Sequence, residues 1–348
     1  MPVTIQRTHR LIRMAGKISG RRTQKAEGRE ARLQNLRVAL VNNMPDAALE
    51  DTEQQFAELL EAAAVDTPIH LSLFSLPEVP RGARGRRRIA EVYNRIEELW
   101  NSRFDAAIVT GTEPRQPDLR QEPYWKTFTQ VMDWAEENTR SVVLSCLAAH
   151  AGVLHRDGIE RHRLAEKQFG VFEYESAKQH FLMQGAANRV CIPHSRWNEV
   201  KQPALEECGY EVLTYSRDAG ADLFVKKRKR SLVVHFQGHP EYGAKTLLKE
   251  YRRDVKRFIR GDRETYPAMP HGYFDAEASN LMIEFREKVH RHKQEGILRE
   301  FPEAAVAARL HNSWRPSAVA IYRNWLRFVA FREAVEPAQF LLAGAGRA

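Results

Sequence analysis

The chain has few cysteines and no long apolar run. Only three of its 348 residues are cysteine, too few for a disulfide framework, and this scarcity favours a reducing compartment. No apolar stretch approaches the ~20 residues that span a bilayer, and the N-terminal residues lack the apolar core of a secretory signal. The sequence therefore predicts a cytoplasmic protein that does not associate with membranes.

Two further kinds of site are missing from the sequence. No group of His, Cys and Asp has the spacing of metal ligands, and no glycine-rich phosphate loop is present. We therefore expect no metal and no bound cofactor. Since 43% of the residues are hydrophobic, the chain can bury one large core or two modest ones.

Positive charge is in excess and is unevenly distributed. The net charge is +9, and arginines and lysines gather in residues 7–32 and in Arg81–Arg88. One interpretation is a nucleic-acid-binding arm. However, no aromatic side chains interleave with these arginines, as a base-stacking platform requires. We favour a solvated tail and loop that help to attract anionic substrates, and we expect no nucleic-acid partner. Contact of Arg81–Arg88 with the phosphates of a coenzyme is an alternative.

The first half of the chain alternates between two kinds of pattern. Residues 1–34 are expected to be a basic, flexible leader. Apolar runs then predict strands over 36–42, 69–74, 104–110 and 141–145, with helical patterns over 51–63, 88–100 and 124–137. Short connections between such elements predict an α/β fold with a doubly wound, mostly parallel sheet of the flavodoxin-like type.

The second half has a different organisation. Short strands are expected over 189–193, 211–216, 222–225 and 231–236, with a hairpin turn at 217–222. Helices are expected over 244–260, 275–294, 302–310 and 316–334. We interpret residues 35–335 as a single α/β domain with a helical C-terminal extension, followed by a tail over 336–348.

A cysteine and a His-Pro-Glu run both follow predicted strands. Cys146 ends the apolar run 141–145 and begins a helix-like run, while His239 and Glu241 follow the run 231–236. Functional groups of such sheets gather at the carboxyl ends of the strands. A thiol, an imidazole and a carboxylate placed there suit a Cys-His-Glu acyl-transfer enzyme. The backbone N–H groups of Leu147 and of the Gly111 region are candidates for an oxyanion hole, and the helix N-terminus favours the thiolate form of Cys146.

Four other residues have side chains suited to chemistry. His150 lies four residues after Cys146, on the same helix face, and is a rival base, although a packing role is the simpler interpretation. His235 lies on the same strand face as His239 and could support it. Cys191 and Cys208 are expected to be structural.

The combination of Cys146 with His239-Pro-Glu241 resembles class I glutamine amidotransferases, but the cysteine lacks the flanking glycines of their Gly-x-Cys-x-Gly turn. The chain has Leu144-Ser-Cys-Leu-Ala148 instead. Further stretches resemble the homoserine O-acyltransferases of the homoserine transsuccinylase family, which share that fold. These stretches are Val41-Asn-Asn-Met-Pro45, Ile108-Val-Thr-Gly111, Ala165-Glu-Lys-Gln-Phe-Gly-Val-Phe-Glu173, Pro193-His-Ser-Arg196, Gly238-His-Pro-Glu-Tyr242 and Trp314-Arg-Pro-Ser317.

This resemblance implies a ping-pong reaction. Cys146 would take an acyl group from a coenzyme A thioester, and the γ-hydroxyl of L-homoserine, deprotonated by His239, would then receive it. At the matching positions Lys167, Ser195 and Arg253 would line the substrate site. Arg253 is chemically suited to the carboxylate of homoserine. The resemblance also suggests a homodimer.

The acyl donor depends on one position in the family. Some members use acetyl-coenzyme A and others succinyl-coenzyme A, and the position shortly after Thr110-Gly111 is often Glu in the former and Gly in the latter. Here it is Arg115. A guanidinium can pair with the succinyl carboxylate, so we expect succinyl transfer, with acetyl as the alternative. Glu113 could neutralise Arg115 or face the acyl group itself.

Three alternatives to this function stay open in the sequence. L-Serine is a possible acceptor, because the one methylene by which it differs from homoserine is worth only ~1–3 kcal/mol in a pocket. A glutamine-hydrolysing amidotransferase would release ammonia from glutamine. A non-catalytic basic protein would bind nucleic acid in a salt-sensitive way.

Overall fold

The computed structural model describes residues 3–7, 10–12, 35–65 and 67–331. Within them the largest sheet has nine strands in the order β2-β1-β4-β3-β5-β6-β13-β12-β9. The strands are β1 Thr4–Arg7, β2 Arg10–Ile12, β3 Leu36–Val41, β4 Ile69–Phe74, β5 Ala106–Thr110, β6 Ser141–Ser145, β9 Glu211–Val212, β12 Leu223–Arg228 and β13 Ser231–Phe236. Neighbours from β1 across to β13 pair in parallel, and the outer pairs are antiparallel. The predicted mostly parallel α/β sheet is confirmed.

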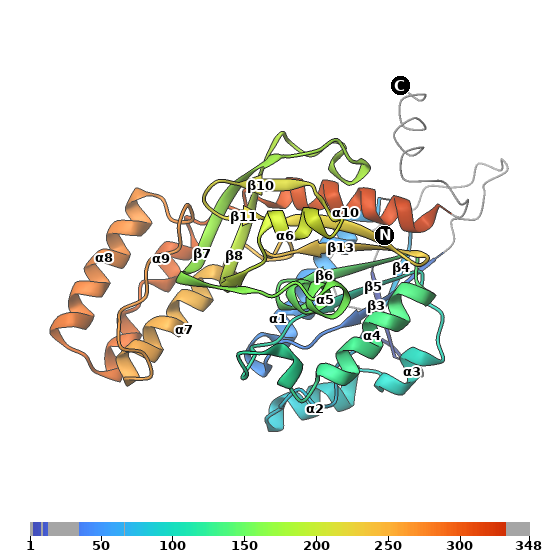
Figure 1. The fold of residues 1–348 in the computed structure, drawn as a ribbon. Coiled ribbons are helices and arrows are strands. Elements are labelled where there is room, and N and C mark those ends of the chain that lie inside the picture. The colour runs from blue at the N-terminus through green and yellow to red at the C-terminus, as the bar shows by residue number, and fades with distance from the viewer. Residues whose placement is uncertain (1–2, 8–9, 13–34, 66, 332–348) are drawn as a thin grey trace, which may run out of the picture.

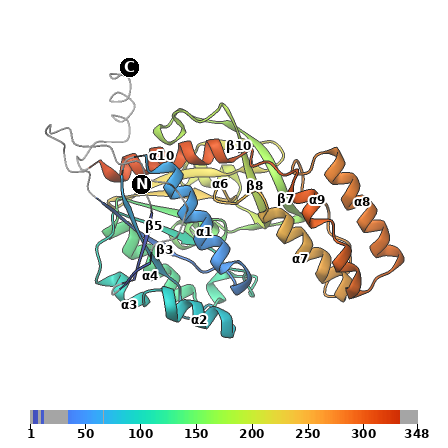
Figure 2. The same cartoon turned by 180° about the vertical axis from the view of Figure 1, so that it is seen from behind.

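Helices cover both faces of this sheet (Figures 1 and 2). Val38 and Leu40 belong to one buried cluster, with α1 (Asp46–Ala63) and α10 (Arg315–Ala330). Ala39 and Val41 belong to another, with α4 (Trp125–Asn138) and α5 (Leu147–Asp157). Successive side chains of a strand point to opposite faces, so β3 contributes to both cores. Strands buried on both faces have continuous apolar runs, which is why the sequence pattern located them.

The strand order reverses at β3. The chain goes from β3 to β4 on one side and returns to β5 on the other. In such sheets ligands bind where the strand order reverses, outside the carboxyl ends. Asn43, just after β3, donates its backbone N–H to the Thr110 side chain of β5 at 2.8 Å. The ends of these two strands, and Cys146 at the end of β6, therefore meet at one edge of the sheet.

In the first half of the chain, two of the predicted helices differ from the structure by more than one residue. The helix expected over 51–63 begins at Asp46. The helix expected over 88–100 is wrong as a single element, because α2 (Ala83–Val92) and α3 (Ile96–Trp100) are separate. Between them Tyr93 is buried and extended, and its hydroxyl donates to Glu53 at 2.8 Å. The helical spacing continues across the break, and this contact with a distant helix interrupts it.

A second, smaller sheet has the order β11-β10-β7-β8. Its strands are β7 His162–Ser176, β8 Arg189–Glu199, β10 Thr214–Ser216 and β11 Gly220–Ala221. The predicted hairpin at 217–222 is confirmed by the pairing of β10 with β11. The long strand β7 was not predicted, because most of its side chains are exposed or half-buried and form no apolar run.

The predicted helical extension is present, but its last helix belongs to the main body. Helices α7 (Thr246–Arg260), α8 (Ala276–Arg291) and α9 (Glu303–Ala307) lie together at one end of the molecule (Figures 1 and 2). In contrast, α10 packs on the large sheet, where Trp325 donates from Nε1 to the Ser141 hydroxyl at 2.9 Å.

A close backbone contact joins β7 to the segment between α7 and α8. Val171 N–H donates to the His271 carbonyl at 2.7 Å, and His271 N–H donates to the Phe169 carbonyl at 2.9 Å. Gly170 lies between them with φ of 140°, and a Cβ there would be 2.3 Å from the His271 backbone. Only glycine permits this approach, so this residue couples the small sheet to the helical extension.

The expected flexible leader is wrong for its first residues. Val3 and Ile5 are 8% and 3% exposed and belong to the core, where β1 pairs with β4. Their apolar side chains cover the edge of the large sheet. Residues 13–34 and the tail over 336–348 lie outside the described residues. None of the described helices has the length and apolar character that crossing a membrane requires.

Candidate active site

Cys146 occupies the turn between β6 and α5. Its backbone has φ of 53° and ψ of −112°, a conformation that is strained for a residue with a side chain. Its N–H donates to the Phe236 carbonyl, at the end of the neighbouring β13, at 2.7 Å. The turn places the thiol at the N-terminus of α5, as predicted, where the helix dipole favours negative charge.

His239 and Glu241 follow β13 and interact directly. His239 Nδ1 is 2.8 Å from Glu241 Oε1, and the backbone N–H of His239 donates to the Pro193 carbonyl at 2.8 Å. The imidazole also stacks on the Tyr242 ring, with centroids 4.2 Å apart and an angle of 15°. The ring is thus held by Glu241 and Tyr242, and the carboxylate fixes its tautomer. Tyr242 was not singled out in the sequence.

The charges around His239 favour its protonated form. Burial lowers the pKa of His239, but the charge of Cys146, the charge of Glu241 and hydrogen bonds to both side chains raise it well above its usual value. An imidazolium beside a thiolate is the activated state of a cysteine nucleophile. The structure thus brings together all three residues that the sequence suggested for the chemistry.

The two segments proposed to supply the oxyanion hole, at Gly111 and at Leu147, lie in close contact. A Cβ at Gly111 would lie 2.4 Å from Leu147 Cβ and 3.0 Å from Leu147 N. Any larger residue at 111 would push the end of β5 away from the start of α5. The absence of a side chain lets the two backbones meet beside Cys146, where backbone donors can face a developing oxyanion.

The three candidate substrate residues gather around two carboxylates of α7. Lys167 Nζ donates to Asp254 Oδ2 at 2.9 Å and is 3.8 Å from Glu250. The Ser195 hydroxyl donates to Glu250, and Arg253 Nε is 3.3 Å from Asp254 Oδ1. Burial lowers the pKa of Arg253, but the two carboxylates raise it above its usual value.

Sequence reasoning missed the carboxylates at the centre of this cluster. Glu250 and Asp254 lie four residues apart on α7 and therefore on one face of it. The Tyr242 hydroxyl donates to Glu250 Oε1 at 2.7 Å, so Tyr242 connects the His239 ring with the substrate cluster. The signal available in the sequence was the position of Glu250 one turn before Arg253.

Arg115 lies on the loop that leaves Gly111. It is exposed, and its backbone N–H donates to Glu122. The ion pair of Glu113 is with Arg257 of α7, at 3.7 Å. The loop therefore runs from the oxyanion-hole region to the helix that carries Arg253. The role of Arg115 at the acyl group stays a prediction.

His150 and His235 are buried and pack against other side chains. His150 is buried, its Nε2 is 2.9 Å from Gln237 Oε1, and burial lowers its pKa to about 3. His235 stacks on Phe224, with centroids 4.6 Å apart, and burial lowers its pKa to about 3 as well. Cys191 and Cys208 are half-buried among apolar neighbours. These surroundings agree with structural roles.

The arginines of 81–88 are not a solvated loop. They lie on α2 and just before it, and three of them pair with groups at or near α1. Arg81 donates to the Ser75 hydroxyl at 2.9 Å and is only 8% exposed in its side chain. Arg84 pairs with Glu50 at 2.7 Å, and Arg88 pairs with the buried Glu53. Arg81 also pairs with Asp46 of α1 at 3.4 Å, so three of the five arginines have a carboxylate partner, although the Arg84 side chain is 80% exposed.

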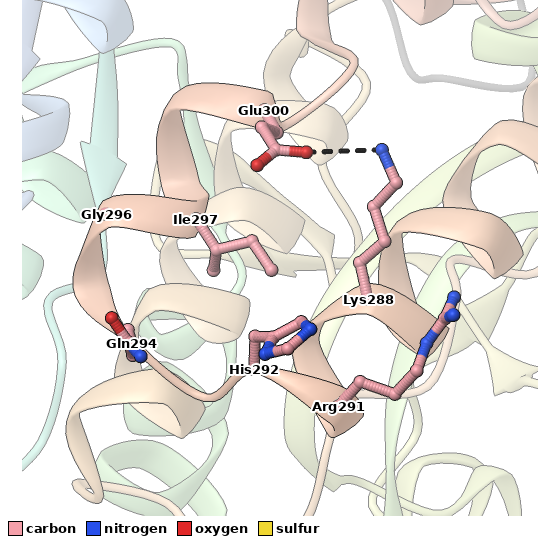
Figure 3. A pocket seen from close by; sticks show the side chains of 7 residues that line it. All are labelled: Lys288, Arg291, His292, Gln294, Gly296, Ile297 and Glu300. Carbon is pink, nitrogen blue, oxygen red and sulfur yellow. Dashed lines mark hydrogen bonds and ion pairs between the residues drawn. The ribbon is translucent and has the colours of Figure 1, made fainter.

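One hollow of the structure lies away from these residues. It has a volume of about 540 Å³ and is lined by residues of α8, of the 3₁₀ helix η3 (Glu295–Glu300) and of the connection between them (Figure 3). Lys288 spans it to Glu300 at 3.2 Å. None of its lining residues is Cys146, His239 or Glu241. None belongs to the α7 cluster either, which consists of Lys167, Ser195, Glu250, Arg253 and Asp254. In the part of the chain that the structure describes, no three His, Cys, Asp or Glu side chains could hold a metal ion.

Comparison with known proteins assigns the chain to a family. The family model described as homoserine O-succinyltransferase matches residues 2–335. The chain belongs to the homoserine O-succinyltransferase family. A relative of that name from Rhodopseudomonas palustris is 44% identical over 298 residues, covering 86% of this chain and 89% of the relative. Another, from Methylorubrum extorquens (strain DSM 6343 / CIP 106787 / DM4), is 41% identical over 300 residues, covering 86% and 89%.

Solved structures give a more distant similarity than the family. A glutamine amidotransferase from Methylobacillus flagellatus matches with a TM-score of 0.45 at 13% identity, covering 87% of this chain and 98% of that one. One from Thermotoga maritima matches with a TM-score of 0.43 at 14% identity, covering 78% and 98%.

Proposed function

We propose that this chain transfers the succinyl group of succinyl-coenzyme A to the γ-hydroxyl of L-homoserine, giving O-succinyl-L-homoserine for methionine biosynthesis. The observation that carries the proposal is the cluster of Cys146, His239 and Glu241 next to the charged groups of α7. Family membership and the names of the relatives favour succinyl over acetyl as the acyl group.

In the first half of the reaction Cys146 accepts the acyl group. The thiolate attacks the thioester carbonyl, and the C–S bond to coenzyme A breaks as the new thioester forms. The oxyanion of the tetrahedral intermediate would be stabilised by backbone N–H groups near Leu147 and Gly111. His239 gives its proton to the departing thiolate of coenzyme A.

In the second half of the reaction, homoserine takes the acyl group from Cys146. With Cys146 acylated, the negative charge that raised the pKa of His239 is gone, and the neutral imidazole takes the proton of the γ-hydroxyl. The alkoxide attacks the thioester carbonyl, and Cys146 leaves as a thiolate beside the imidazolium. Glu241 holds the ring throughout and offsets its positive charge.

The α7 cluster has the groups that a zwitterionic acceptor needs. Arg253 and Lys167 are suited to the carboxylate of homoserine, and Glu250 is suited to its ammonium group. These groups pair with one another in the structure. Binding of the acceptor would therefore break these ion pairs and replace them with ion pairs to the acceptor. Tyr242 would then connect the acceptor site to the base.

Arg253→Ala is expected to raise the KM for L-homoserine by about 10- to 100-fold, because one charge-assisted contact to a carboxylate is lost. The KM for the acyl donor should change much less. Arg252→Ala is the matched control, because Arg252 is the neighbouring residue and pairs with Glu303 at 3.0 Å. Steady-state kinetics of both variants check this, and equal effects of the two changes would contradict the assignment.

The donor and the acceptor are tested together by mass and rate measurements. Intact-mass spectrometry after mixing with succinyl-coenzyme A is expected to show a succinyl adduct that L-homoserine discharges. The kcat/KM for succinyl-coenzyme A should exceed that for acetyl-coenzyme A, and L-homoserine should be preferred to L-serine. A strong preference for acetyl-coenzyme A would overturn the proposed donor.

A further inference from the structure

The loop after β5 is held in place by two oppositely charged side chains. Glu122 Oε1 accepts the backbone N–H groups of Arg115 and of Gln116, the latter at 2.6 Å. Arg161 Nη2 donates to the carbonyls of Gln116 and Pro117, at 3.3 and 3.0 Å. Four main-chain groups of residues 115–117 are thus bound by side chains from outside the loop.

We call Glu122 and Arg161 the clamp residues, and neither is an exposed side chain. Glu122 is only 4% exposed and follows the 3₁₀ helix η1 (Leu119–Gln121). Arg161 comes from the connection between α5 and β7 and is half-buried. Burial lowers the pKa of Arg161, while the charges of Tyr124 and Glu122 raise it, so the two clamp residues also attract each other. A side chain that satisfies several backbone groups of one loop restricts that loop to a single conformation.

The clamped segment is part of the loop that leaves the end of β5. Gly111, at its start, touches Leu147 beside Cys146, and Glu113 reaches Arg257 on α7. An acetyl group on Cys146 ends in a methyl close to the reacting carbonyl. A succinyl group extends further by a methylene and a carboxylate, so its far end is the part that would meet this loop.

We propose that Glu122 and Arg161 are positioning residues that set the preference for a succinyl donor by fixing where residues 115–117 place the Arg115 side chain. The inference rests on the proposed function, because it assumes an acyl-cysteine on Cys146. Neither residue touches the reacting atoms, and both act through the backbone of the loop. Displacing the loop therefore weakens contact with the succinyl carboxylate and leaves an acetyl group unaffected.

The test compares the two donors in the full-length enzyme. Glu122→Ala removes the acceptor of two N–H groups and is expected to lower the kcat/KM ratio of succinyl- to acetyl-coenzyme A by about tenfold, mainly through the KM for the succinyl donor. Glu122→Gln keeps an acceptor oxygen and should stay within about threefold of the wild type. Arg161→Ala should lower the ratio in the same direction as Glu122→Ala, as should Arg115→Glu.

A control and the acetyl donor separate positioning from general damage. Glu137→Ala removes an exposed carboxylate of α4 that pairs with Lys229 and should leave the ratio unchanged. If Glu122→Ala and Arg161→Ala lower both donors equally, or change neither, the inference is overturned. If Glu122→Ala does not fold, Arg161→Ala decides the question. The wild-type ratio alone tests the proposed donor, so failure of that proposal is distinguishable from failure of this one.

Discussion

Replacing Cys146 by alanine is expected to abolish the covalent succinyl adduct and to lower kcat on the order of 10⁴-fold or more, because no other group can form the acyl-enzyme. The backbone turn at Cys146 has φ of 53°, and alanine retains the same backbone restrictions, so the fold should persist. Intact-mass spectrometry and initial rates on one preparation check both parts of the prediction.

The two other cysteines provide the matched controls. Cys191 and Cys208 are half-buried, free thiols away from the turn, and Cys191→Ala and Cys208→Ala should each keep the adduct. An adduct that survives in Cys146→Ala and disappears in Cys191→Ala would move the nucleophile to β8. Retention in all three variants would point to a residue other than cysteine.

Glu241→Gln is expected to slow transfer to homoserine by about 10³- to 10⁴-fold, because the amide no longer fixes the imidazole in the required tautomer. It should also change the pH dependence. The charge of Glu241 raises the pKa of His239, so removing that charge lowers this pKa. His239 must be neutral to accept the hydroxyl proton, and the acidic limb of the rate profile therefore moves to lower pH.

Single-turnover transfer from pre-acylated enzyme isolates this effect, because the Cys146 thiolate is then absent. Rates would be measured across pH with saturating L-homoserine. Glu175→Gln, which changes an exposed carboxylate of β7 that pairs with Arg189 at 3.6 Å, should leave the limb in place. An acidic limb that stays unmoved or rises in Glu241→Gln would show that Glu241 does not act on the His239 charge.

The central sheet and the approach of Cys146 to His239 could be predicted from the sequence for one shared reason. Strands buried on both faces are continuous apolar runs, and polar residues that interrupt such runs mark strand ends. Cys146 and His239 each follow a run of this kind. Two parallel neighbours in the sheet bring those ends together, so strand position alone was enough to associate the two residues.

The rest depended on contacts between segments far apart in the chain. Strand β7 is formed by pairing with β8 and has no periodic signature of its own. Tyr93 interrupts a helical pattern because of a bond to a helix 40 residues earlier. Glu250 and Glu122 are ordinary surface-type residues in the sequence, and only the approach of other segments buries Glu122 and half-buries Glu250 beside their partners. Local pattern carries no information on such partners.

The absence of a side chain at Gly170 affects the geometry of the proposed acceptor site. Lys167 comes from β7, whereas Glu250, Arg253 and Asp254 come from α7, and the backbone bridge at Gly170 and His271 joins β7 to the segment that follows α7. A misplacement of about 1 Å in such a site can cost 100-fold in rate. The distance between the Lys167 ammonium group and the carboxylates of Glu250 and Asp254 thus depends on the absence of a Cβ atom at Gly170. If the α7 residues bind the acceptor as proposed, a glycine at position 170 is required for the geometry of that site.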